Sequence, residues 1–195
     1  MEFIVQKIGM SRTVSVPATP VTLLKVLDTK VCDVNEGVGF VSYSSGKKFN
    51  KTIEGQQKKF NLSKEFNRFA TITVANTEAG DLDVSPLAEA NVLRTTFKTK
   101  GRGFSGAVKR WNFAGGRASH GHRMGRRTGS IGNAEWPGRV MRGKKMPGQY
   151  GNTNVSVKND VVSFDAETGI LVVKGSVSGP NGALGRVKVA KWVKQ

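Results

Sequence analysis

The sequence predicts a mainly β protein, an antiparallel barrel of six to seven strands with a long, irregular basic extension inserted between two of them. Three observations support this fold class. Short runs rich in β-branched residues recur between Pro, Gly, Ser and Asn residues. Almost no stretch shows helical periodicity, which favours a closed all-β architecture. One long segment, 98–152, differs from the rest in charge and in apolar content.

The expected strands lie on both sides of that segment. Five precede it, at 2–9, 21–28, 36–43, 69–74 and 91–97. Two follow as a hairpin within 154–177, whose turn is expected at Glu167, Thr168 and Gly169, and a last strand is expected at 186–194. Residues 1–97 and 153–195 are therefore expected to form one globular body.

Two stretches of this body lack the pattern of a strand. The polar and basic run that begins at Ser44 is expected to be a surface excursion over 44–69, ending in a short helix over 62–69. Leu62, Phe66 and Phe69 recur there at helical spacing, and we interpret them as packing that helix onto the body. An acidic, turn-rich linker over 76–90 precedes the strand at 91–97.

The positive charge of the chain is concentrated in segment 98–152. It holds 13 Lys or Arg residues, 13 glycines and one acid, Glu135, whereas the other 140 residues hold 18 bases and 13 acids. The whole chain has a net charge of +17. Concentrated basic charge is typical of phosphate binding. Because the segment has only three branched aliphatic residues, it cannot build a core of its own. We therefore expect it to become ordered only when it binds a nucleic acid.

Composition also argues against a disulfide-bonded, secreted or membrane-spanning protein. Cys32 is the only cysteine, which excludes an intramolecular disulfide and favours a reducing compartment. The start of the chain has an acid at Glu2 and too short an apolar run for a signal peptide, and no window is long and apolar enough for a membrane span. We therefore expect a cytoplasmic protein without a membrane partner.

Gly101, Gly103 and Gly106 match the G-x-G-x-x-G pattern of dinucleotide-binding proteins. That interpretation requires an amphipathic helix next and an acid about twenty residues later, and the sequence has neither. Glycines also allow a backbone to pass close to phosphates. We favour this second interpretation, because the same stretch supplies cations for those phosphates: Lys98, Lys100, Arg102, Lys109 and Arg110.

The two histidines, His120 and His122, lie two residues apart inside the basic segment. A zinc site usually needs four ligands, and the single cysteine is far away in sequence. No nucleophile with an orienting partner accompanies them, so the sequence predicts no metal site and no catalytic residues. Stacking on bases or hydrogen bonding to RNA is the favoured role.

Aromatic residues are interleaved with the Lys and Arg residues of the segment, at Trp111, Phe113, Trp136 and Tyr150. In a segment without a core, such residues favour stacking on unpaired bases. For Trp136 a second interpretation, an anchor onto the barrel, stays equally open. The middle of the segment prefers arginine, whose planar guanidinium suits bidentate phosphate contacts, at Arg117, Arg123, Arg126 and Arg127.

Three longer motifs, KGRGFSGAVKRWNF (100–113), HGHRMGRRTGSIG (120–132) and PGRVMRGKKMPGQYGN (137–152), carry a resemblance to a known family. KIGMSR at 7–12 and LVVKGSVSG at 171–179 add to it. On these motifs the chain resembles ribosomal protein L three, the universal third protein of the large ribosomal subunit, in its bacterial form. Glu135 stands where bacterial members often carry a glutamine that is sometimes methylated, and Phe97 where many carry glycine.

The resemblance implies a translation-protein-type barrel whose extension enters large-subunit (23S) rRNA near its 3′ end and helps to nucleate subunit assembly. The tip of the extension, about 113–125, would reach toward the peptidyl-transferase centre. The partners implied are this rRNA and other large-subunit proteins, with no small-molecule substrate, no enzyme activity and no cofactor except Mg ions held by the rRNA.

The site residues expected from these arguments fall into two groups. The rRNA-binding group is Lys98, Lys100, Arg102, Lys109, Arg110, Trp111, Arg117, His120, His122, Arg123, Arg126, Arg127, Arg139, Arg142, Lys144 and Lys145. The tip group is Phe113, Gly115, Gly116, Ser119, Gly121 and Met124. Two alternatives stay open: an RNA-modifying or RNA-remodelling enzyme that uses His120 or His122 near a flipped base, and a non-specific nucleic-acid-binding protein that packages DNA.

Overall fold

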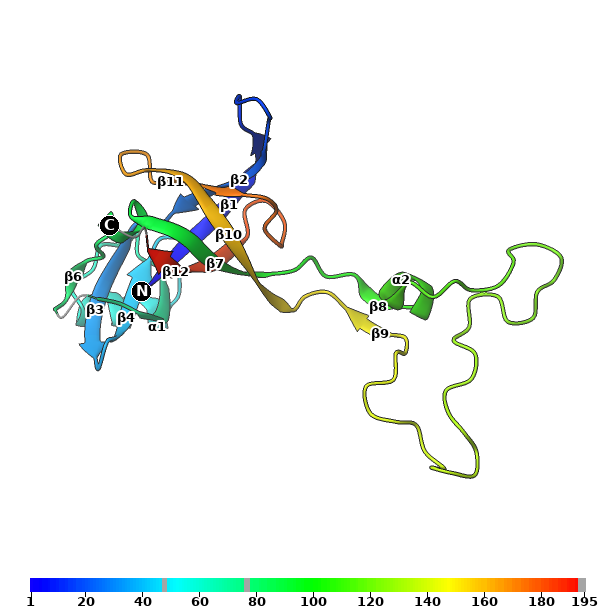
Figure 1. Ribbon diagram of the computed structural model, residues 1–195. Coiled ribbons are helices and arrows are strands. Elements are labelled where there is room, and N and C mark those ends of the chain that lie inside the picture. The colour runs from blue at the N-terminus through cyan, green and yellow to red at the C-terminus, as the bar shows by residue number, and fades with distance from the viewer. Residues whose placement is uncertain (47–48, 76–77, 193–195) are drawn as a thin grey trace. The chain divides into compact units, whose positions relative to one another are not determined.

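A computed structural model describes residues 1–46, 49–75 and 78–192 of the chain (Figure 1). The chain divides into two compact units. The first, called the globular unit below, comprises Met1–Lys98 and Asn154–Gln195, and the second, called the extension, is Thr99–Thr153. No helix in the described part of the chain is both long enough and apolar enough to cross a membrane.

Six antiparallel strands of the globular unit close into a barrel, which confirms the predicted fold class. Around the barrel the order is β1 (Glu2–Arg12), β12 (Leu184–Trp192), β7 (Ala90–Lys98), β10 (Asn154–Asp165), β11 (Ile170–Lys174) and β2 (Pro20–Val26). Because β1 pairs with both β12 and β2, the barrel is closed, and closure leaves none of its strands as an edge.

The interior of the barrel is filled by alternate residues of these strands. In β7, for example, Leu93, Thr95 and Phe97 are buried at every second position. Gly185 of β12 lies opposite Phe97 in the ladder, and a Cβ at this position would lie 2.5 Å from carbons of the Phe97 ring. Glycine therefore gives the ring its space. The buried cluster includes Phe3, Val5, Leu24, Leu93, Phe97, Leu171, Val173 and Val187.

A second sheet stands beside the barrel in the globular unit, and this corrects one expectation. Runs 36–43 and 69–74, predicted as barrel strands, do form strands, but these belong to a four-stranded sheet in the order β5-β4-β3-β6. Among the described residues β4 pairs with β3 on one side and with β5 on the other, so it takes no part in the barrel. The strands of this sheet are β3 (Thr29–Asn35), β4 (Val38–Tyr43), β5 (Arg68–Thr73) and β6 (Gly80–Asp81).

The second sheet has its own apolar core, which includes a residue of the barrel. Val31, Val41, Ile72 and Val74 pack with Ile4, which comes from β1. The neighbours of Ile4 in sequence, Phe3 and Val5, belong to the barrel core instead. Strand β1 is therefore buried on both faces at this point, which explains its uninterrupted apolar run.

Strand β3 was not expected, and it forms a hairpin with β4. The turn is Glu36–Gly37, where both residues have positive φ, 49° and 76°. Two-residue hairpin turns of this hand match the twist of the strands that they join. The strand predicted from Glu36 therefore begins two residues later, at Val38.

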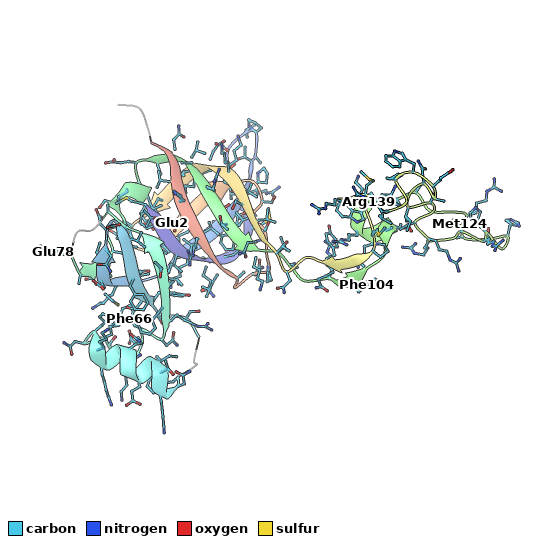
Figure 2. All side chains as sticks on the ribbon, turned by 90° about the horizontal axis from the view of Figure 1, so that it is seen from below. Glu2, Phe66, Glu78, Phe104, Met124 and Arg139 are labelled. Carbon is cyan, nitrogen blue, oxygen red and sulfur yellow. The ribbon has the colours of Figure 1, made fainter. Side chains whose placement is uncertain are left out.

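The helix predicted at 62–69 is wrong; the helix of this region is α1, Lys51–Lys59. It begins at Asn50, whose Oδ1 accepts a hydrogen bond from the Ile53 N–H at 2.9 Å. Only Gln57 of this helix is buried, and its Nε2 donates to the carbonyl of Phe66 at 2.8 Å. Phe66 therefore lies in the connection to β5, near α1 (Figure 2). A capping residue, rather than apolar spacing, sets the position of this helix.

The remaining expectations for the globular unit hold in part. The hairpin after the extension is formed by β10 and β11, with its turn between Asp165 and Ile170 as predicted. The linker 76–90 contains β6 and the 3₁₀ helix η1, Ser85–Leu87. Positions 47–48 of the excursion, 76–77 of the linker and 193–194 of the last expected strand lie outside the described residues.

Candidate nucleic-acid interface

The extension begins and ends in a short two-stranded ladder (Figure 1). β8, Gly103–Ser105, pairs antiparallel with β9, Gly148–Tyr150. The helix α2, Ala107–Trp111, follows β8 directly and ends at Asn112, which has a left-handed conformation. Five residues are too few for the helix that a dinucleotide site needs, which agrees with the sequence argument against such a site.

Two side chains of α2 attach it to the returning chain. The Nη1 of Arg110 donates to the carbonyl of Met146 at 2.9 Å, and the Nε1 of Trp111 donates to the same carbonyl at 2.8 Å. A Cβ on Gly148 would lie 2.6 Å from Nη1 of Arg110, so glycine leaves room for the guanidinium. Sequence reasoning missed Met146 and Gly148, since a backbone acceptor leaves no trace in a sequence pattern.

Two of the expected stacking residues have cations of the same unit against their rings. The guanidinium of Arg110 lies 5.1 Å from the centre of the Trp111 ring, and the Nζ of Lys145 lies 5.9 Å from it. The guanidinium of Arg102 lies 5.2 Å from the Tyr150 ring. Such cation–π contacts hold the charged side chains in place against the rings, near β8, α2 and β9.

Two other aromatic side chains of the extension are almost fully exposed. Trp136 is 86% exposed, and Phe104, which was not among the expected site residues, is 79% exposed. Among the described residues, neither ring stacks on another aromatic ring or lies against a cation. Exposed rings on a cationic segment are suited to stacking on nucleobases. The sequence feature that could have identified Phe104 as a site residue is its position within the GRGFSG motif.

The predicted tip residues form a loop that closes on itself. The Gly116 N–H donates to the carbonyl of Gly125 at 2.7 Å, and the Gly125 N–H donates to Nδ1 of His122 at 3.2 Å. A Cβ on Gly116 would collide with the His122 ring, so the ring fits against a bare backbone. Gly115, Gly121 and Gly125 have positive φ, which suits glycine.

The two histidines have different surroundings. Because Nδ1 of His122 accepts a backbone hydrogen bond, the neutral ring carries its proton on Nε2, where it can donate. His120 has a left-handed backbone and an exposed side chain. Among residues 1–46, 49–75 and 78–192, no three His, Cys, Asp or Glu side chains come together as metal ligands.

The charge of the extension is not neutralised within the described structure. The two ion pairs found there, Lys30 with Asp81 and Lys58 with Glu54, lie in the globular unit, and both apolar clusters lie there too. In Figure 2 side chains project from the extension along its length, including the labelled Phe104, Met124 and Arg139. The extension therefore offers uncompensated, solvent-exposed cations.

The structure places the expected site residues as follows. Lys98 is the last residue of β7 and belongs to the globular unit. Lys100 to Trp111 lie around β8 and α2, and Phe113 to Arg127 lie in the tip loop. The remaining bases lie on the returning chain, at Arg139, Arg142, Lys144 and Lys145, near exposed apolar side chains that were not expected as site residues, Ile131, Val140 and Met141.

A closed barrel with a cationic, core-poor insertion is thus the architecture of this chain. Residues 48–163 match the family model described as ribosomal protein L3. A protein of Wolinella succinogenes called large ribosomal subunit protein uL3 is 69% identical over 192 residues, covering 98% of this chain and 100% of the relative. Proteins of the same name are 63% identical in Campylobacter jejuni, covering 98% and 100%, and 39% identical in Thermotoga petrophila, covering 97% of each.

The chain belongs to the ribosomal protein L3 family. The resemblance seen in its motifs is therefore confirmed.

Proposed function

We propose that this chain is a structural component of the large ribosomal subunit and that its extension binds large-subunit rRNA. The observation that carries the proposal is the combination, in one unit, of many exposed cations with no acidic partner among the described residues and no apolar cluster. A polyanion supplies the neutralisation that the unit lacks. Family membership adds support, because relatives at 63–69% identity are named as large-subunit proteins.

Binding is driven mainly by the release of counterions from phosphates. Each phosphate that a Lys or Arg neutralises contributes roughly −0.9 to the slope of log affinity against log salt on a duplex, and less on single strands. Shape, more than base sequence, sets specificity, since RNA is recognised through its backbone and through stacking on unpaired bases. Trp136 and Phe104 are the rings available for such stacking, because both are exposed.

We further propose the finer placement that the family resemblance implies. The extension enters 23S rRNA near its 3′ end, and its tip lies toward the peptidyl-transferase centre. Support comes from the compact tip loop, in which a backbone hydrogen bond and His122 hold Gly116 and Gly125 together. A loop of glycines without a core is narrow, so it fits between closely packed RNA helices.

The chain acts in this proposal as a scaffold within the cytoplasmic ribosome, binding early in subunit assembly, and catalyses no reaction. Its partners are the rRNA and other large-subunit proteins, and the Mg ions near it are held by the rRNA. The Nε2 of His122 contributes a hydrogen bond to RNA in this role, since Nδ1 is already engaged with Gly125.

Sedimentation of a tagged chain from lysate on a sucrose gradient, repeated after a high-salt wash, tests the proposal. We expect the tag to stay in the large-subunit peak. Arg126→Ala with Arg127→Ala should slow the appearance of mature subunits while the melting temperature of the purified chain stays unchanged. Recovery only in light fractions contradicts the ribosomal assignment, and rRNA turnover lost on His120→Ala would revive the enzyme alternative.

A further inference from the structure

A cavity of about 360 Å³ lies in the globular unit, where the end of the barrel meets the second sheet. Its lining comes from the end of β2 and the start of β3, from β6 and the residues after it, and from the end of β10 and the turn that follows. Phe66, in the connection before β5, completes it. The size falls in the range of ligand-binding pockets. Apolar side chains form much of its wall: Val26, Leu27, Leu82, Val84 and Phe164.

One carboxylate in the lining has no partner. Asp28 is exposed, and it makes no hydrogen bond or ion pair with any described residue. The other lining acid, Asp81, pairs at 3.9 Å with Lys30, which is the only base in the lining. The Nζ of Lys30 also lies 5.5 Å from the centre of the Phe66 ring, so this cation is already engaged on two sides.

Further carboxylates stand next to the lining in sequence. Asp83 lies between Leu82 and Val84, and hydrogen bonds from Ser85 lower its pKa. Asp165 lies between Phe164 and Ala166, and the hydroxyl of Thr168 lowers its pKa. Both groups are ionised at neutral pH. Lys25 stands next to Val26 of the lining in the same way, but carboxylates still outnumber bases there. This end of the globular unit is therefore acidic in a chain whose net charge is +17.

Apolar walls with a free carboxylate at the rim select a particular kind of ligand. The side chains of arginine and lysine have an apolar stem and a charged end, so they bury the first while pairing the second. A phosphate group is repelled by the same carboxylates. The charge of the cavity thus complements a basic protein segment and opposes RNA.

We propose that this cavity receives an arginine or lysine side chain from a basic segment of another protein, with Asp28 pairing with its charged group. The proposal goes beyond rRNA binding, because the cavity belongs to the globular unit and not to the extension. It makes this acidic end of the barrel a protein-docking surface. It also stands or falls independently of what the extension binds.

The test is a titration of the isotopically labelled full-length chain with N-acetylarginine amide, followed by NMR. We expect chemical-shift changes at the backbone amides of Leu27, Thr29, Leu82 and Gly169, and no such changes with N-acetylglutamine amide or N-acetylleucine amide. Asp28→Asn should weaken the binding about fivefold, the usual upper value for an exposed ion pair. Asp160→Asn is the matched control, since Asp160 is exposed on β10 and does not line the cavity.

Ala166→Phe gives an independent check, because Ala166 lines the cavity and is exposed in the turn after β10. Filling the space should weaken binding without removing a charge, and the unchanged spectrum of the remaining amides reports that the chain is folded. Equal shifts with the arginine and leucine amides would overturn the proposal in favour of an apolar ligand. Shifts of these amides on adding a short RNA oligonucleotide, or no shifts with the arginine amide at millimolar concentration, would overturn it as well.

Discussion

The globular unit and the extension order their chains by opposite means. In the globular unit, side chains such as Phe3, Leu24 and Leu171 are fully buried, and ladders of hydrogen bonds satisfy the backbone. In the extension the buried residues are small, Ser105 and Ala107, and all the Lys and Arg side chains except that of Arg110 are exposed. Burial stabilises the first unit, and in our proposal phosphate neutralises the second.

From this difference we expect the stability of the chain and its proposed RNA binding to be separable. The ladder between β7 and β10 ends at Lys98 and Asn154, which lie directly opposite each other. The extension is therefore inserted where two neighbouring strands already meet, and the barrel pairing does not depend on the residues between them. Variants that change one unit, with both properties measured, test this separation.

Replacing 99–153 by Asn-Gly is expected to have the largest effect. A two-residue turn of this type closes a hairpin between strands that face each other, so the globular unit should still unfold cooperatively. Affinity for a large-subunit rRNA fragment should fall on the order of a thousandfold or more at moderate salt, because most phosphate contacts are lost. Filter binding and thermal unfolding measure the two effects. Affinity close to that of the intact chain would place the RNA contacts on the barrel.

Leu171→Ala changes the opposite unit. Leu171 is fully buried in the barrel core, so its truncation should lower the free energy of unfolding by about 2–5 kcal/mol. The salt dependence of rRNA binding should stay the same at temperatures where the variant is folded. Val162→Ala, at a position that is 46% exposed on β10, is the control, with an expected change within about 0.5 kcal/mol. A changed salt slope in Leu171→Ala would show that the two units are coupled.

Gly116→Ala is expected to act within the tip alone. The added methyl group collides with the His122 ring and disturbs its hydrogen bond from Gly125. Affinity for the rRNA fragment should fall up to about tenfold, equivalent to one or two hydrogen bonds, with no change in melting temperature. Gly132→Ala is the control, since the nearest atom to its Cβ position, the carbonyl oxygen of Arg139, lies at 3.6 Å, an ordinary contact distance. A loss of the same size in the control would argue against a specific role of the tip contact.

Thr168→Ala is expected to have the smallest effect, and it depends on pH. The Thr168 hydroxyl donates to Oδ2 of Asp165 at 2.6 Å and lowers the pKa of this carboxyl below 3.8. A lowered folded-state pKa contributes stability that is present above 3.8 and is lost as the pH falls through the lowered value. The variant should therefore melt slightly below the parent at neutral pH, and the difference should disappear in acid.

Thr73→Ala provides the matched comparison for that measurement. Thr73 is exposed on β5, and its side chain makes no hydrogen bond with the described residues, so any change in melting temperature should be the same at both pH values. If Thr168→Ala behaves in the same way, the ion–hydroxyl contact in the turn makes no contribution.

Local patterns identified most of the strands because alternation is a property of neighbouring residues. The run 91–97 shows it, with Leu93, Thr95 and Phe97 buried in the structure. The hairpin turn after Asp165 was predicted in the same way, from its turn residues. The prediction failed where a cap or turn went unrecognised, as at Asn50 before α1 and at Glu36–Gly37 before β4.

The internal contacts of the extension were also beyond local reasoning. Charge and glycine content were enough to predict that 98–152 binds a nucleic acid. They do not reveal that Arg110 and Trp111 share the carbonyl of Met146, 35–36 positions away along the chain. Charge and glycine content also do not distinguish Trp111, which has cations against its ring, from Trp136, which is 86% exposed.

The fold class, the family and the place of the cationic insertion follow from the order of residues alone, because alternation, motif order and the local concentration of charge are properties of that order. Only the tertiary structure decided which strands share a sheet, so that β3 to β6 form a second sheet and Ile4 leaves the barrel core for it. It also decided that Asp28 lines a cavity, with no ion-pair partner among the described residues. Pairing and cavities depend on which distant segments meet, and a strand's own pattern does not specify its partner.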